Sequence, residues 1–191
     1  ESLPQLGGML RVGIPDYRLR PDVLDKEINH ILRLGMTVKT SVQLGSDITL
    51  EDFITEGFAA VYLAVGAHLP AKIGIPGEAD SRDVIDAIRF LREVNLERRT
   101  APGRQVTVIG GGNVAIDSAR AAKRLGTDEV TVVYRRSAEE MPAYAEEIQG
   151  ARAEGVEIKY LTAPIEVVVK DAKVIGLKCI QTRLGEPDAS G

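Results

Sequence analysis

The sequence predicts an α/β fold built around a mainly parallel sheet. Helical and strand-like patterns alternate along the 191 residues, which is typical of that class. Residues 106–134 read as a strand, a glycine turn, a helix and a second strand, the βαβ unit of a parallel sheet. This length accommodates one or two domains.

In the first block, Gly and Pro are frequent and no period is sustained over residues 1–20, so we expect an irregular, extended segment there. Pro21 suits the first turn of a helix, and Gly35 ends the helical pattern. A short strand is expected at 36–39.

Further along, Thr49 and Asp52 form a capping-box pattern that opens a short helix. The apolar run 58–65 is partly β-branched, which predicts a buried strand of the parallel sheet. An amphipathic helix is expected over 83–95. The polar stretch 97–105 follows it, and we place the domain boundary there, giving domains of residues 1–98 and 99–191.

The second block begins with a strand at 106–109, a helix at 113–125 and a strand at 130–134. Ser137 and Glu140 are spaced to cap the next helix. Further strands are expected at 157–161, 167–169 and 174–180, the last two turning at Asp171-Ala172, so that a β-meander follows the parallel sheet.

The composition is that of a folded globular domain. With 24 Lys and Arg against 28 Asp and Glu, the net charge is −4, which argues against a general nucleic-acid surface. No apolar run reaches the roughly 18 residues of a membrane span. We therefore expect a cytoplasmic protein with neither nucleic-acid nor membrane partners.

The redox options are narrow because Cys179 is the only cysteine and there are two histidines. A lone cysteine forms no internal disulfide and holds no iron–sulfur cluster, so redox chemistry requires a bound cofactor. We expect Cys179 to have a packing role. No catalytic residue and no metal site stands out.

The strongest chemical signal is the G-x-G-x-x-A motif Gly110-Gly111-Gly112-Asn113-Val114-Ala115, placed between a strand and a helix. Gly110 allows the tight turn, Gly112 allows a pyrophosphate to approach the backbone, and Ala115 allows close packing of helix and sheet. The amides of Asn113 and Val114 would face the phosphates. The alternatives are a glycine turn without a ligand and a methyltransferase-type loop.

At the end of the next strand, about 20 residues on, an NAD site carries Asp or Glu for the ribose. This chain has Arg135 and Arg136 there. Guanidinium groups match a 2′-phosphate, which favours NADP, with a solvated basic pair as the alternative. The acids Asp128 and Glu129 precede the strand, at its opposite end, so we expect no opposing charge and a preference for NADPH of roughly 10²- to 10³-fold.

These motifs occur among further stretches that resemble the small (beta) subunit of NADPH-dependent glutamate synthase. The wider group includes dihydropyrimidine dehydrogenase and related FAD/NAD(P) oxidoreductases. The stretches are 7–19, 23–28, 60–67, 75–77, 110–117, 134–137 and 141–143.

The resemblance implies a Rossmann-like NADPH domain, incomplete at its C-terminus, inserted into an FAD domain of which the first block is a part. It also implies that Ala64 and Gly66 lie where the chain passes between the two domains. Val65 departs from the usual Ala-Thr-Gly, which removes a hydroxyl there. The residues that would line the flavin are Gly7, Gly8, Ile14 and Pro15.

For function, the resemblance implies that NADPH reduces FAD and that electrons leave through iron–sulfur centres, in missing or partner segments, to a large glutamate synthase subunit or another acceptor subunit. The alternatives are a related reductase whose acceptor is ferredoxin or a pyrimidine, and a nucleotide-binding module without turnover. Because the chain starts at Glu1 and lacks the family's terminal flavin segments, we expect a fragment that is inactive alone and purifies without stoichiometric FAD. Homo-oligomerisation stays open.

Overall fold

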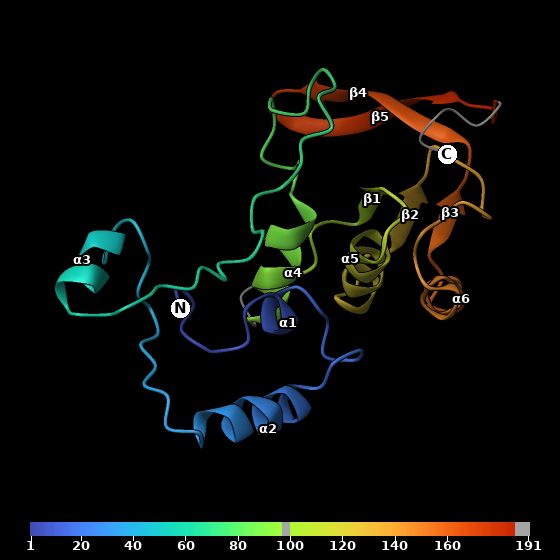
Figure 1. Cartoon of the computed structure of the whole chain (residues 1–191). Helices are drawn as coiled ribbons and strands as arrows, with labels where there is room; N and C mark the ends of the chain where they lie inside the picture. The colour runs from blue at the N-terminus through green and yellow to red at the C-terminus, as the bar shows by residue number, and fades with distance from the viewer. Residues whose placement is uncertain (97–99, 186–191) are drawn as a thin grey trace. The chain divides into compact units, whose positions relative to one another are not determined.

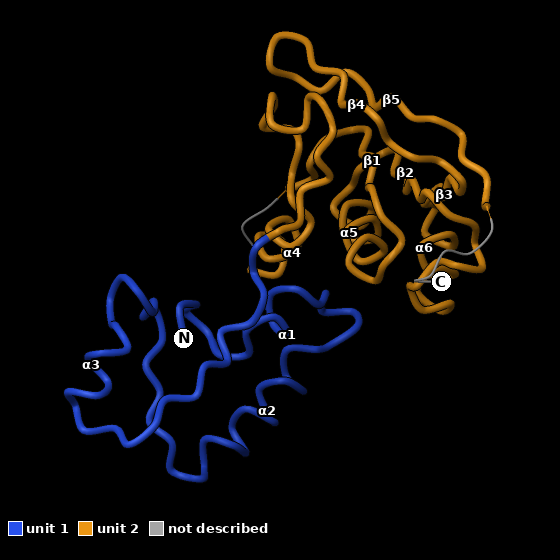
Figure 2. The backbone as a smooth tube through the Cα atoms, turned by 45° about the horizontal axis from the view of Figure 1, so that its top comes forward, with its two compact units in different colours: residues 1–69 blue, residues 70–191 orange. Residues whose placement is uncertain are grey.

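The computed structural model describes residues 1–96 and 100–185, shown in Figure 1. The chain divides into two compact units, Glu1–Leu69 and Pro70–Gly191, coloured separately in Figure 2. The expected domain boundary between 98 and 99 lies outside the described residues and stays a prediction. The units divide earlier in the chain, because the helix before residue 96 packs with the second block.

The centre of unit 2 is a parallel sheet in the order β1-β2-β3. Its strands are β1 (Gln105–Ile109), β2 (Glu129–Val133) and β3 (Glu157–Lys159). The helices α5 (Asn113–Arg124) and α6 (Ala145–Ala153) connect them and lie on the same face of the sheet (Figure 1). The predicted βαβ unit is confirmed, and with it the Rossmann-like α/β fold.

A small-residue face on α5 brings this helix close to the sheet. Ala119 and Ala122 are buried beside Ile116, and Val132 of β2 is fully buried in the same cluster. Helix α4 (Ala87–Asn95) adds Leu91 to this core. It begins four residues later than expected, because the Asp86 side chain accepts a hydrogen bond from Arg89 N and caps the helix there.

The last two strands, β4 (Thr162–Lys170) and β5 (Lys173–Gln181), form an antiparallel hairpin longer than the sequence suggested. Asp171 and Ala172 have φ of 51° and 60°, so both central residues of the turn are left-handed, as in a type I′ hairpin. Along the hairpin, Pro76 O accepts a hydrogen bond from Val167 N at 2.8 Å.

Between β2 and β3 the expected helix start was wrong. Helix α6 begins at Ala145, not beside Ser137, although Ser137 and Glu140 do contact each other. Pro142 disfavours the helical conformation of the residue before it, Met141, so the turn at Ser137 cannot continue into a helix.

The described residues of unit 1 contain three helices, of which α3 is capped by side chains. α2 (Pro21–Leu32) begins with proline in its first turn, as predicted. α3 (Leu50–Thr55) has the predicted capping box, and the hydrogen bond from Thr49 N lowers the pKa of the Asp52 carboxyl. Residues 1–20 are not irregular throughout, because α1 (Gly8–Val12) forms and buries Val12 completely.

Both strands expected in unit 1 were wrong. Residues 36–39 and 58–65 lie in neither helix nor strand, and the apolar run 58–65 is exposed rather than buried. A strand is stabilised by hydrogen bonds to a neighbouring strand. Within the described part of unit 1, the one bridge joins Leu44 and Ile48, so neither run has a partner.

We expect the apolar segment 58–69 to bind a hydrophobic dye, because its large side chains face solvent; Tyr62 and Leu69 are 92% and 93% exposed. Replacing Leu63 and Leu69 by Lys should lower the fluorescence of bound anilinonaphthalene sulfonate by about half. The control is Leu184→Lys, an exposed residue of unit 2. Equal effects of both changes would contradict the prediction.

Candidate functional site

The glycine turn joins β1 to α5 in three residues. Gly110 has a φ of 134°, which side-chain-bearing residues rarely adopt, and its N–H donates to Val133 O at 3.1 Å. A Cβ at Gly110 would lie 3.4 Å from the Cβ of Ala115, an ordinary contact. The first glycine is therefore required by the turn, as predicted, and the small Ala115 keeps helix and strand close.

Gly112 caps the N-terminus of α5 through its main chain. Its carbonyl accepts hydrogen bonds from Ala115 N and Ile116 N, and no atom lies within 4 Å of where its Cβ would be. The side chain of Val114, in the first turn of α5, is exposed. The amides of Asn113 and Val114 belong to the first turn, where a helix leaves its N–H groups without intrahelical partners, so this helix start suits an anion.

Gly111 has a different role that the motif does not specify. A Cβ there would lie 2.5 Å from the ring of Tyr134, so any larger residue would collide with it. Gly111 O also accepts a hydrogen bond from Ala143 N at 3.1 Å. The middle glycine lets the end of β2 and the loop before α6 pack against the turn.

Tyr134 connects four segments at this edge of the sheet. Its N–H donates to Lys159 O and its carbonyl accepts from Thr162 N, both at 2.9 Å. Its hydroxyl donates to Glu140 O at 2.7 Å. β2 is therefore fixed to β3, to β4 and to the loop that follows it.

Directly after Tyr134 come the two predicted phosphate ligands. The main chain of Arg135 accepts a hydrogen bond from Thr182 Oγ1, and that of Arg136 accepts one from Leu161 N. Both side chains are exposed, and neither makes an ion pair within residues 1–96 and 100–185. Two guanidinium groups on a fixed main chain are suited to bind a phosphate.

The expectation that no acid opposes these arginines took account only of the acids before the strand, and two carboxylates of the following turn lie near Ser137. Ser137 Oγ lies 3.2 Å from both Glu139 Oε2 and Glu140 Oε2, and Ser137 N donates to Glu140 Oε2 at 3.1 Å. The turn after the strand brings both carboxylates back to Ser137, next to Arg136. Sequence separation from the strand start did not show this.

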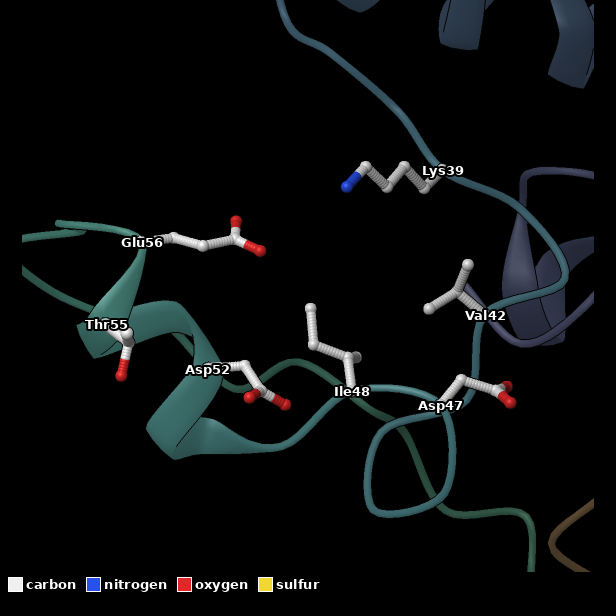
Figure 3. Close-up of a pocket in the computed structure, with 7 residues that line it drawn as sticks. All are labelled: Lys39, Val42, Asp47, Ile48, Asp52, Thr55 and Glu56. Atoms are coloured by element: carbon white, nitrogen blue, oxygen red, sulfur yellow. The ribbon is translucent and has the colours of Figure 1, made fainter.

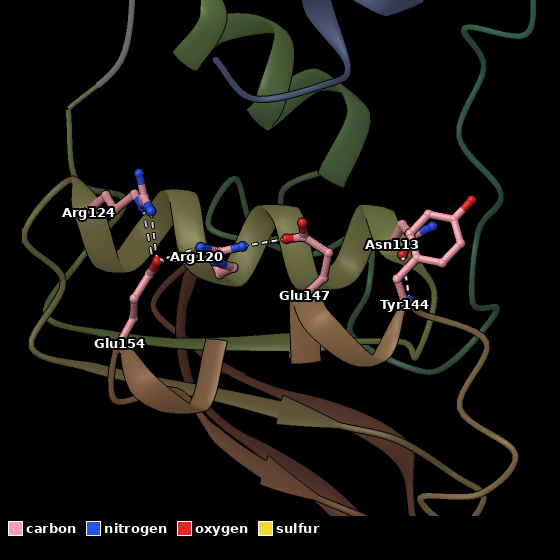
Figure 4. A network of polar contacts seen from close by, with 6 residues as sticks. All are labelled: Asn113, Arg120, Arg124, Tyr144, Glu147 and Glu154. Carbon is pink, nitrogen blue, oxygen red and sulfur yellow. Dashed lines mark hydrogen bonds and ion pairs between the residues drawn. The ribbon is translucent and has the colours of Figure 1, made fainter. Parts of the chain in front are cut away.

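Asn113 holds the loop before α6 to the start of α5. Its Oδ1 accepts a hydrogen bond from Tyr144 N, the residue that precedes α6, at 3.0 Å (Figure 4). The side chain of Asn113 is thus used within the protein, while its amide still belongs to the first turn of α5. The two helices consequently begin side by side.

Farther along the same helices, Arg120 of α5 joins Glu147 of α6 and Glu154, the residue directly after α6 (Figure 4). The Arg120 side chain is 11% exposed and donates to Glu154 Oε1 at 2.7 Å. Gly150 makes room for it, since a Cβ there would lie 3.0 Å from the guanidinium carbon. These ion pairs fix α6 along α5 and so position the loop that reaches the glycine turn.

The ion pairs also affect the Glu154 carboxyl. Burial raises its pKa, but hydrogen bonds from Arg124 and Arg120 lower it by more, so the pKa lies below its ordinary value of 4.5. Since the folded pKa is below that of the unfolded chain, this carboxylate stabilises the fold above the ordinary value. The stabilisation is lost as the pH falls through the folded pKa.

The residues expected to line a flavin lie in and beside α1 of unit 1. Gly7 has a φ of 121° at the start of α1, and Gly8 begins that helix with open space around it. Ile14 and Pro15 follow the helix, half-buried and buried respectively. Ala64 and Gly66, which are expected where the chain passes between the two domains, lie on the exposed run after α3.

A hollow in unit 1 lies outside all these predicted residues (Figure 3). The side chains of Lys39 and Glu56 reach into it from opposite walls. Asp52 is already used in the capping box of α3. We assign it no function. Its lining is Lys39, Val42, Asp47, Ile48, Asp52, Thr55 and Glu56.

Cys179 on β5 is half-buried, and burial raises the pKa of its thiol above 9.0, against a smaller opposing effect of the Lys159 charge. A protonated thiol is a poor nucleophile, which supports the packing role. Among the described residues no cluster of His, Cys, Asp or Glu could hold a metal ion, and no helix is long and apolar enough to cross a membrane.

Residues 11–185 match the model of the pyridine nucleotide-disulphide oxidoreductase family. The chain belongs to this family. The match spans both units, so the family resemblance seen in the sequence is confirmed.

Two relatives align over nearly all of the chain. It is 44% identical to the NADP(+)-dependent formate dehydrogenase subunit beta of Moorella thermoacetica, matching 100% of this chain and 27% of that protein. It is 35% identical to the glutamate synthase [NADPH] small chain of Escherichia coli K12, matching 98% of this chain and 42% of that one. The chain therefore spans well under half the length of these relatives.

Among solved structures, FprA of Mycobacterium tuberculosis in complex with NADPH superposes with a TM-score of 0.81 at 21% identity. The alignment covers 100% of this chain and 57% of that one. At this level of identity the likeness concerns the fold, and it confirms the predicted architecture over both units.

We predict that Arg120→Met lowers the free energy of unfolding by about 1–3 kcal/mol, because Glu147 and Glu154 each lose a largely buried ion-pair partner. The loss should shrink as the pH falls from neutral to below the ordinary pKa of 4.5 and Glu154 becomes protonated. Urea unfolding across this range measures it. The control Arg124→Met, with a side chain 46% exposed, should cost less than about 1 kcal/mol, and an equal cost would contradict the proposed difference.

Replacing Gly111 and replacing Gly112 by alanine should change the stability of the fold to different extents. Gly111→Ala should destabilise the fold by about 1–3 kcal/mol, since the added methyl group collides with Tyr134. Gly112→Ala places its methyl group in open space and should stay within about 1 kcal/mol of wild type. Thermal or urea unfolding compares the two, and similar losses would show that the Tyr134 contact is unimportant.

Proposed function

We propose that unit 2 binds NADPH and that the chain is the nucleotide-binding part of an NADPH-dependent flavin oxidoreductase. The observation that carries this is the pairing of an open α5 N-terminus at Gly112 with the exposed Arg135 and Arg136 at the end of the adjacent strand. One feature suits a pyrophosphate and the other a ribose 2′-phosphate. Both follow the carboxyl ends of parallel strands, where α/β folds bind nucleotides.

The contacts of the turn give each residue a defined part in this binding. Gly110 turns the chain, Gly112 leaves room for the pyrophosphate, and the amides of Asn113 and Val114 donate to it. Gly111 and Ala115 act on the protein itself, through Tyr134 and through the packing of α5. The family to which the chain belongs is itself named for a pyridine nucleotide, and the FprA structure named above contains NADPH.

We infer that unit 1 contributes to an FAD site. Gly7, Gly8, Ile14 and Pro15 surround α1, where open space at Gly8 would admit a ligand to the main chain. Ala64 and Gly66 would lie where the chain passes between the cofactor domains. A bound flavin would take up a hydride from the nicotinamide and release electrons singly, chemistry for which the protein chiefly supplies positioning.

The acceptor of the electrons is a further part of the proposal. The two relatives are named as subunits or chains of different enzymes, a formate dehydrogenase and a glutamate synthase. We propose that this chain likewise belongs to a larger enzyme, with iron–sulfur centres and an acceptor subunit outside these residues. A nucleotide-binding module without turnover is the competing reading, and flavin bleaching by NADPH in the whole protein separates the two.

We predict that the chain prefers NADPH to NADH and that Arg135 and Arg136 cause the preference. Each charge-assisted bond contributes about 1.5–3 kcal/mol when shielded from water. Solvent exposure and the nearby Glu139 and Glu140 reduce this, so we expect about a 10- to 100-fold preference. Replacing both arginines by Ala should remove it while leaving NADH binding nearly unchanged, as measured by calorimetric titration.

The matched control is Arg104→Ala. Arg104 is an exposed arginine before β1, paired with Asp128 at the other end of the strands. Its loss should weaken neither nucleotide. Gly112→Ala should weaken NADPH and NADH alike, because its methyl group occupies the space needed by the pyrophosphate they share. Equal wild-type affinities for the two nucleotides would refute the role of the arginines.

A further inference from the structure

Ser137 and Glu140 make the contacts of a helix cap where no helix begins. Glu140 Oε2 accepts from Ser137 N at 3.1 Å and lies 3.2 Å from Ser137 Oγ. The next helix starts only at Ala145 and is preceded by Tyr144, which has no side-chain cap. The contact therefore needs another explanation than helix capping.

Its position offers one. Ser137 directly follows Arg135 and Arg136, so two neutral donors and two guanidinium groups occur in three consecutive residues. The main chain of this segment is held by Leu161 N and Thr182 Oγ1, and Glu140 O is held by the hydroxyl of Tyr134. Donors that hold one carboxylate oxygen are equally suited to a phosphate oxygen.

We propose that Ser137 and Glu140 determine specificity for the 2′-phosphate of NADP(H), an inference that rests on the proposed function. The N–H and hydroxyl of Ser137 bind a phosphate oxygen beside the two arginines. In the free protein the Glu140 carboxylate takes these donors, and the arriving phosphate displaces it. Glu140 thus competes with the phosphate, which lowers affinity for nucleotides that carry it and leaves the others unaffected.

Glu140 has this role rather than Glu139, because the two acids contact Ser137 differently. Glu140 accepts from the main-chain N–H and lies within reach of the hydroxyl, whereas Glu139 contacts the hydroxyl alone, at 3.2 Å. A hydroxyl has one proton to donate, so the two carboxylates share it. Removing the charge of Glu139 should therefore release fewer donors than removing that of Glu140.

Calorimetric titration of the whole chain tests this with two probes, adenosine 2′,5′-bisphosphate and adenosine 5′-monophosphate. They differ only in the 2′-phosphate. Glu140→Gln should raise affinity for the bisphosphate about two- to five-fold, the range of an exposed charge interaction, and leave the monophosphate unchanged. Glu139→Gln should have a smaller effect. Ser137→Ala should weaken the bisphosphate alone, and Ser137→Thr, which keeps the hydroxyl, should restore it.

The charge control is Glu129→Gln. Glu129 begins β2 at the opposite end from the arginines and accepts a hydrogen bond from Gln105 Nε2 at 2.8 Å. It should change neither affinity. An unchanged bisphosphate affinity in Glu140→Gln, or an equal rise for both probes, would overturn this inference while the proposed function stands. A wild-type chain that does not distinguish the probes would overturn both.

Discussion

The ring of Tyr134 lies where a side chain on Gly111 would begin. The arrangement of unit 2 where β1 and β2 end depends on this contact. The tyrosine ends β2, bonds to β3 and β4 through its main chain, and reaches Glu140 O through its hydroxyl. The glycine turn ends β1 and starts α5. Close packing between them therefore sets where the arginines after β2 stand relative to the helix that would receive a pyrophosphate.

A second set of contacts holds α6 and the loop before it against α5. Arg120 binds one carboxylate in α6 and one directly after it, and the Asn113 side chain binds the main chain just before that helix. Because α5 is the helix of the glycine turn, α6 and the loop before it are tied to the same element. Glycine is unfavourable inside a helix, and Gly150 is explained by the guanidinium that it admits.

The two units differ in how their apolar residues are covered. In unit 2, parallel strands and alanine-rich α5 bury one continuous cluster. In unit 1, large hydrophobic side chains such as those of Tyr62 and Leu69 remain exposed. The sequence pattern of the run 58–65 resembles that of the strands in unit 2, yet the run forms no strand. The reason is that an apolar, β-branched run becomes a strand only beside another strand.

The sequence by itself determined the features that depend on near neighbours in the chain: the βαβ unit, the glycine turn, the capping box of α3, the proline start of α2, and the arginines after β2. The tertiary structure decided what distant residues do to one another. It gave Gly111 its role through Tyr134, used the Asn113 side chain within the protein, paired Arg120 with Glu147 and Glu154, and left two expected strands unformed. Local patterns encode turns and caps because few residues make them, whereas packing and charge at a site depend on segments that meet only in the folded chain.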